Sequence, residues 1–142
     1  MIKDEFSSTK LCQTFDINYE NKAFSVEIYF GESEKTESIH FKAYEKSSIS
    51  KFIFINAFNL NQLINMSKVF KICDNFKEAF ALILQKFKDK EVVLFLDDDL
   101  DIIIDFPLPN KKTDKVKFVL SKQKLKDSEL MDKLYANIAF LQ

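Results

Sequence analysis

The sequence predicts an α+β fold: an antiparallel β-barrel or sandwich of about seven strands, with an inserted helix-turn-helix and a C-terminal helix. Three observations predict this fold. Four strand-like segments come first, the spacing of apolar residues then changes to that of helices, and three more strand-like segments precede a last helical stretch. Because runs of strands are split by a helical pair, we expect an antiparallel sheet with the helices packed on one face.

The four N-terminal strands are predicted from two kinds of apolar pattern. The first three alternate apolar and polar residues, which places the apolar side chains on one face. The fourth is a short run of aromatic and β-branched residues, which favours a strand buried on both faces. Residues 31–35 are expected to form a loop with the only glycine, Gly31, at a positive φ. The predicted strands are residues 15–19, 24–30, 39–44 and 52–55.

A helical insert is predicted for residues 59–89. Asn59 is a candidate N-cap for a short helix that carries Leu60, Leu63 and Ile64. Asn75 and Glu78 then have the three-residue spacing of a capping box. Six apolar residues with helical spacing follow, and they predict the buried face of the second helix. They are Phe76, Ala79, Phe80, Ile83, Leu84 and Phe87.

Three strands and a helix complete the predicted domain. Residues 92–96 and 102–106 flank an acidic turn and are expected to pair as a hairpin, which the following prolines end. Residues 116–120 form the last strand. We therefore place a globular head at 1–124 and a C-terminal helix, a candidate coiled-coil stub, at 125–142. Its apolar seam has heptad spacing, which suits either packing on the sheet of its own domain or dimerisation. The seam consists of Met131, Leu134, Ile138 and Leu141.

The composition limits the functions that this domain can have. The chain has 142 residues, enough for one domain, and no run of about 18 apolar residues that could cross a membrane as a helix. All 21 basic residues are Lys, with one Gly, one His and two Cys. One Gly cannot build a Walker loop or a dinucleotide-binding turn, and these few His and Cys cannot form a zinc site. We therefore expect no enzyme, no catalytic residue, no cofactor and no metal.

Phe, His and Cys often mark a functional site, but in this sequence we expect them to have structural roles. Most of the 16 Phe lie on periodic apolar faces, so we expect them in the core. His40 lies on the polar face of its strand, where a solvent-facing role or a cross-strand partner is expected. Cys12 and Cys73 have no neighbouring base, and with no visible secretory signal they are expected to be reduced thiols.

The order of these elements resembles the globular heads shared by the centriolar cartwheel protein and the scaffolds of non-homologous DNA end joining. The resemblance covers the chain from about Phe15 to its end and is one of element order and hydrophobic pattern. It implies a small β-barrel that is interrupted by a helix-turn-helix and continues into a C-terminal helix that dimerises as a coiled coil. The residues that carry it are 24–30, 39–44, 60–87, 92–106, 116–120 and the seam from Met131.

The cartwheel branch of this resemblance implies a contact between heads. In that branch a hydrophobic residue projects from the hairpin before the last strand and enters a pocket on a neighbouring head. The matching loop here is 106–110, and its tip hydrophobe is Leu108. Leu108 is therefore the candidate residue for head pairing, although an aromatic residue is more typical at that position.

Charge is segregated in the C-terminal half. Residues 97–101 hold four Asp, which suit either a solvated turn or a weak cation site, although the calcium-loop pattern fails after its fifth position. The next segment is rich in Lys, which suits either a solvated strand or a contact by charge alone with the acidic surface of tubulin or with a nucleic-acid backbone. Lys without Arg argues against specific nucleic-acid recognition. The candidate contact residues are Lys111, Lys112, Lys115 and Lys117.

Together these observations predict a non-enzymatic scaffold or protein-interaction domain of the centriole, basal body or axoneme. Its expected partners are proteins: a second copy of itself, tubulin or axonemal proteins, with no membrane and no nucleic acid. The expected location is cytoplasmic, at the cytoskeleton of the cilium or basal body. Two alternatives stay open at this stage. One is a nuclear DNA-repair scaffold of the same fold, and the other is a small cation-dependent enzyme centred on residues 97–101.

Overall fold

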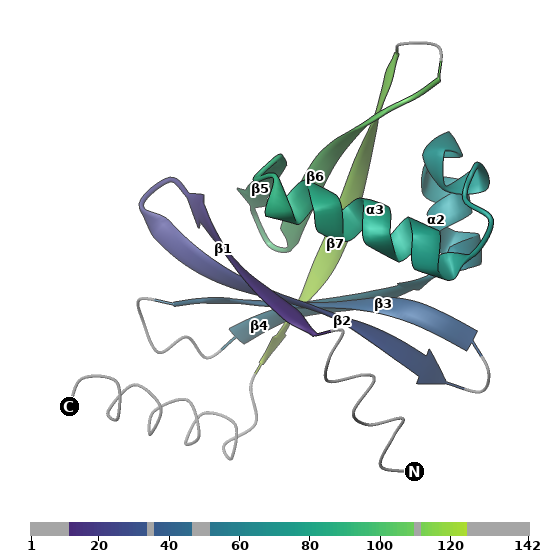
Figure 1. Ribbon diagram of the computed structural model, residues 1–142. Coiled ribbons are helices and arrows are strands. Elements are labelled where there is room, and N and C mark those ends of the chain that lie inside the picture. The colour runs from purple at the N-terminus through teal and green to yellow at the C-terminus, as the bar shows by residue number, and fades with distance from the viewer. Residues whose placement is uncertain (1–11, 34–35, 47–51, 110–111, 125–142) are drawn as a thin grey trace.

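The computed structural model describes residues 12–33, 36–46, 52–109 and 112–124 (Figure 1). This part of the chain forms seven strands, two α-helices and one 3₁₀ helix. In chain order they are β1 (Gln13–Tyr19), β2 (Lys22–Ser33), β3 (Thr36–Glu45), β4 (Phe52–Asn59), α2 (Leu60–Met66), η1 (Lys68–Lys71), α3 (Phe76–Lys88), β5 (Val92–Leu96), β6 (Leu100–Pro107) and β7 (Thr113–Lys124).

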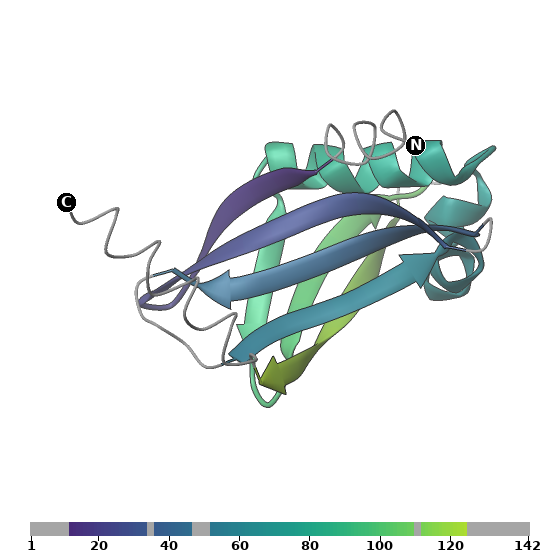
Figure 2. The ribbon, with the colours of Figure 1, turned by 90° about the horizontal axis from the view of Figure 1, so that it is seen from below.

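The strands form one curled sheet in the order β1-β2-β3-β4-β7-β6-β5, and every neighbouring pair is antiparallel. Its two edges, β1 and β5, come close to each other, so the sheet is a nearly closed barrel. The helix α3 lies across the concave side of the sheet (Figures 1 and 2). The predicted fold class is therefore confirmed, while the predicted C-terminal helix at 125–142 lies outside the described residues.

A cluster of phenylalanine rings joins α3 to the sheet. Phe41 on β3 is 1% exposed, and its ring centroid lies 5.1 Å from that of Phe118, 6.0 Å from that of Phe58 and 6.3 Å from that of Phe87. All six residues of the predicted apolar face of α3 are buried. The expectation that most Phe residues pack in the core is confirmed for these positions, although Phe95 is 48% exposed.

Side-chain caps fix both helix starts. Asn59 and Gln62 form a reciprocal capping box at α2, with donor–acceptor distances of 2.9 Å in both directions. At α3, the Asn75 side chain accepts a hydrogen bond from the backbone nitrogen of Glu78, as predicted. The Glu78 carboxylate, however, accepts from the backbone nitrogen of Asp74 rather than from that of Asn75. The second capping box is thus displaced by one residue.

Two sequence predictions about local structure are wrong. Gly31 lies inside β2 opposite Ser38 and does not have a positive φ; in the described residues, Glu20 and Lys90 have that conformation instead. The acidic turn is also shorter than predicted, because β6 begins at Leu100. Leu100 is fully buried, and a buried side chain at this position extends the strand pairing toward the turn.

Two other strands are longer than the apolar pattern indicates. β4 continues to Asn59, and within it Ile53 and Phe54 are both buried, as the prediction of two buried faces requires. β7 extends from Thr113 to Lys124, because its first part pairs with β6 and its last part pairs with β4. The last third of β7, residues 121–124, therefore links the two parts of the sheet through backbone pairing, which a pattern of apolar side chains does not indicate.

Replacing Phe41 by Ala tests the importance of the ring cluster. We expect Phe41→Ala to lower the free energy of unfolding by about 3–5 kcal/mol, because a cavity remains where three rings meet. Phe95→Ala removes the same atoms from a half-exposed position and should cost less than about 1 kcal/mol. Urea denaturation followed by circular dichroism measures both, and equal losses would contradict the assignment of Phe41 to the centre of the core.

Candidate functional site

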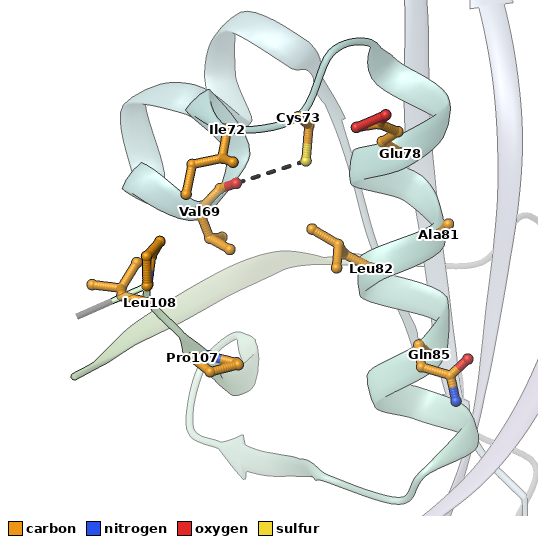
Figure 3. Close-up of a pocket in the computed structure, with 10 residues that line it drawn as sticks. Val69, Ile72, Cys73, Glu78, Ala81, Leu82, Gln85, Pro107 and Leu108 are labelled. Atoms are coloured by element: carbon orange, nitrogen blue, oxygen red, sulfur yellow. Dashed lines mark hydrogen bonds between the residues drawn. The ribbon is translucent and has the colours of Figure 1, made fainter. Parts of the chain in front are cut away.

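An apolar groove lies on the surface between α3, η1 and the connection from β6 to β7. Its volume is about 610 Å³. Figure 3 shows Leu82 pointing from α3 toward Val69 across the groove, with Pro107 and Leu108 beside them. Ile72 and Leu82 are 58% and 38% exposed. Large apolar side chains gathered at an exposed hollow are typical of an interaction surface.

Helical geometry explains why this groove is apolar. The buried stripe of α3 faces the sheet, and Leu82 lies outside that stripe, on the side of the helix that points away from the core. Ala81, its neighbour, is also exposed and has a short side chain, which leaves space beside Leu82. Ile72 caps the end of η1 in a helical conformation and extends into solvent. The packing of the core does not account for these exposed apolar side chains.

Leu108, the predicted head-pairing residue, lies at the rim of this groove. β6 ends at Pro107, and the backbone nitrogen of Leu108 donates to the carbonyl oxygen of Lys112 at 2.7 Å, which holds the chain reversal. Leu108 lies between Pro107 and Pro109, and each proline ring fixes its own φ. The unfolded chain therefore has fewer conformations here, and less conformational entropy is lost when the segment is ordered. Leu108 is half-buried against the core, so the structure places an apolar side chain directly beside an apolar groove.

The few polar groups in the groove are engaged locally. The Cys73 thiol donates to the carbonyl oxygen of Val69 at 3.7 Å. Burial, and then the negative charges of Glu78 and Asp74, raise the pKa of the Cys73 thiol. The thiol therefore stays protonated and is a poor nucleophile. Neither Cys73 nor Cys12 is part of a disulfide.

The predicted basic strip is partly neutralised across the β6–β7 pair. Lys115 lies opposite Asp105 in the register, and Lys117 Nζ lies 3.9 Å from Asp101 Oδ2. The acidic and basic segments that are separate in the sequence thus face each other in space. Lys112 contributes its carbonyl oxygen to the Leu108 turn. Lys111 and the seam of Met131, Leu134, Ile138 and Leu141 lie outside the described residues.

Two carboxylates of the acidic turn have separate partners. Asp99 Oδ1 accepts from the backbone nitrogen of Lys122 at 3.3 Å, while Asp101 lies in β6 and faces Lys117. Within the described ranges, no group of three or more His, Cys, Asp or Glu side chains is placed to hold a metal ion.

The outer face of β2 and β3 holds an arrangement that sequence reasoning missed. The His40 imidazole stacks on the Tyr29 ring, with centroids 4.8 Å apart and an interplanar angle of 11°, and its Nε2 lies 3.0 Å from Ser38 Oγ. Burial lowers the pKa of His40 below its ordinary value, so the neutral form is favoured. A Cβ on Gly31 would overlap this ring. The expected cross-strand partner of His40 is thus Tyr29, and the glycine provides the space.

Comparisons with known proteins give a structural match. No family model matches the sequence, and no curated protein matches it. In the part of the chain that the structure describes, no helix is long and apolar enough to cross a membrane.

The fold is similar to that of solved structures of SAS-6. A stabilised ceSAS-6 dimer has a TM-score of 0.54 and 14% identity, over 73% of this chain and 80% of that one. Two crystal forms of the N-terminal coiled-coil dimer of C. elegans SAS-6 were also found. Form B has a TM-score of 0.59 and 14% identity, over 84% and 73% of the two chains. Form A has a TM-score of 0.57 and 11% identity, over 92% and 93%. At these identities the likeness shows a shared fold.

The contact between Gly31 and His40 can be tested with a double-mutant cycle. Gly31→Ala should destabilise the fold by about 1–3 kcal/mol, because the His40 ring must leave its stack on Tyr29. In the His40→Ala background the same change should be neutral or slightly stabilising, since Ala is a better strand residue than Gly. Urea denaturation of the four proteins measures the coupling, and additive effects would show that the ring does not require the glycine.

Proposed function

We propose that this domain is a non-enzymatic scaffold head that pairs with a second copy of itself in the cytoskeleton of the centriole, basal body or axoneme. The observation that carries the proposal is the position of Leu108 at the rim of an apolar groove whose other wall includes Ile72 and Leu82. The likeness of the fold to SAS-6, a centriolar cartwheel protein whose solved structures are dimers, supports the same assignment.

A half-buried apolar residue beside a groove, both on the same surface, suits a two-fold contact. In such a contact each copy offers the same patch, so Leu108 of each head enters the groove of the other. Burying an exposed Leu or Ile side chain contributes about 1.5–3 kcal/mol. Ordering two molecules costs about 4–15 kcal/mol, so a patch of this size forms a weak pair on its own.

A second self-contact would raise the effective concentration of the heads and so increase the population of the weak head pair. The seam of Met131, Leu134, Ile138 and Leu141 is our proposed second contact, as a short coiled coil that follows the head. A chain with two separate self-contacts joins dimers into a larger assembly, and each contact raises the effective concentration for the other. This is the property that a structural scaffold requires.

The lysine residues are a further part of the proposal. Lys111, Lys112, Lys115 and Lys117 would face an acidic surface such as that of tubulin or an axonemal protein. Since Asp105 lies opposite Lys115 and Asp101 lies 3.9 Å from Lys117, this contact would depend on salt and would be weaker than the lysine count indicates. The proposed location is accordingly the cytoplasm, at the cilium or basal body.

Head pairing can be measured in the full chain after the seam is disrupted with Leu134→Glu and Ile138→Glu. In that background we expect a concentration-dependent dimer by sedimentation equilibrium. Adding Leu108→Glu or Ile72→Glu should weaken it at least about tenfold, because a carboxylate would be buried without a partner.

Val93→Glu is the matched control, because Val93 is 63% exposed on β5, away from the groove, and carries the same change. It should leave the dimer intact. A strict monomer before any groove substitution, or equal weakening by Val93→Glu and Leu108→Glu, would contradict head pairing through this groove.

The cellular site is tested by the localisation of a tagged full chain in ciliated cells of its own organism. We expect punctate signal at basal bodies, and we expect Leu108→Glu to reduce it while the protein level stays constant. Accumulation in nuclear foci after DNA damage would instead favour a repair scaffold of the same fold and contradict the cytoskeletal assignment.

A further inference from the structure

The barrel has an open seam between its two edge strands. In the part of the chain that the structure describes, no ladder joins β1 to β5. The strands come close at one end, where the Tyr19 and Phe95 rings lie edge to face at 6.3 Å. Toward the start of β1 the two strands diverge (Figure 1). An edge strand beside an open space can accept another strand.

The register shows which backbone groups of β1 lack a partner in β2. The carbonyl oxygen of Ala23 bonds to the backbone nitrogen of Lys46, so the odd-numbered residues of β2 bond toward β3. Even-numbered residues of β2 therefore bond to β1, where their register partners are odd-numbered. Consequently the N–H and C=O groups of Thr14, Asp16 and Asn18 point away from the sheet, at its free edge.

These groups face a hollow of about 670 Å³. Five consecutive residues of β1, 14–18, line one side of it, and because side chains alternate between faces, a consecutive run can line a hollow only along the strand edge. The other side comes from the end of α3 and the start of β5. Phe87 packs on Phe15 there, with ring centroids 5.3 Å apart, which gives the hollow an apolar floor.

The rim of this hollow is positively charged. Its one carboxylate, Asp16, is bound by Lys46 at 2.9 Å, so its charge is already neutralised. Lys88 and Lys90 line the opposite side, are exposed, and make no ion pair or hydrogen bond through their ammonium groups among the residues described. A ligand at this edge would therefore be favoured by negative charge.

We propose that the free edge of β1 binds an extended segment of a partner protein in which apolar and acidic residues alternate. The segment adds a strand to the sheet by bonding to the backbone of Thr14, Asp16 and Asn18. Its apolar side chains face Phe15 and Phe87, and its acidic side chains face Lys88 and Lys90. This surface is separate from the groove beside Leu108, so the same head can hold such a partner while it is paired with a second copy.

A fluorescein-labelled hexapeptide of alternating Glu and Val is the probe. We expect it to bind the full chain, measured by fluorescence polarisation. A Lys–Val hexapeptide should bind at least about tenfold more weakly, because its charge matches that of the rim. The Glu–Val peptide with alternate backbone nitrogens methylated should lose binding, because it cannot donate the hydrogen bonds of an added strand.

Variants of the protein locate the site. Thr14→Pro removes one edge N–H without touching the bonds to β2, whereas Thr14→Val keeps that N–H, so only the proline variant should weaken binding. Lys88→Glu with Lys90→Glu should also weaken it at least about tenfold. Lys77→Glu, at the other end of α3, is the matched control and should bind normally. Should Thr14→Pro fail to fold, the methylated peptide still tests the backbone contact.

Amide hydrogen exchange gives an independent readout. The amides of Thr14, Asp16 and Asn18 should exchange rapidly in the free protein and become protected when the Glu–Val peptide is added. No binding of this peptide at millimolar concentration, equal binding of the three peptides, or unchanged exchange would overturn the proposal. Protection that increases with protein concentration in the absence of peptide would also overturn it, since the edge would then pair with a second copy.

Discussion

The packing of α3 into an unclosed barrel is the constraint on which the rest of this structure depends. Because β1 and β5 do not pair, the sheet leaves its concave side open, and the apolar stripe of α3 fills it through contacts such as that of Phe87 with Phe41. Because one face of α3 is buried against the sheet, Leu82 on its opposite face is exposed and lines the groove beside Leu108. The C-terminal end of α3 lies beside β1, and the hollow of about 670 Å³ lies between them. Both candidate surfaces thus follow from one packing choice.

How much of this was predictable depends on whether the cause is local. The buried face of α3 follows from a 3.6-residue period, and the cap at Asn59 acts within three residues, so the sequence predicts both. Gly31 shows the opposite case: it is a glycine because the ring of His40, on the neighbouring strand, occupies the space of its Cβ. No pattern within residues 31–35 contains that fact. The groove also has a non-local cause, since Ile72 and Leu82 form it only together with Leu108, which the fold brings beside them.

The pairing of β6 with β7 changes how the charged segments of the sequence should be interpreted. Acidic residues of β6 and basic residues of β7 form two blocks in the chain, which alone suggests two binding surfaces of opposite sign. The antiparallel register places Asp105 opposite Lys115 and brings Lys117 near Asp101, so part of this charge is compensated locally. Such exposed pairs contribute little to stability. They do reduce the electrostatic field that a distant partner would meet. Lys88 and Lys90, by contrast, make no ion pair among the described residues.

Symmetry separates the roles of the candidate surfaces. A two-fold contact through the groove beside Leu108 uses the same patch on both copies, so it closes at two heads and cannot extend further. Growth of an assembly therefore requires a second, different contact, which the seam beginning at Met131 would supply in cis to each head. A strand-accepting edge at β1 serves another purpose, because its occupant is a different molecule and does not compete for either self-contact. Self-assembly and recruitment of a partner are then independent, since the groove and the hollow lie on different sides of α3 and share no lining residue.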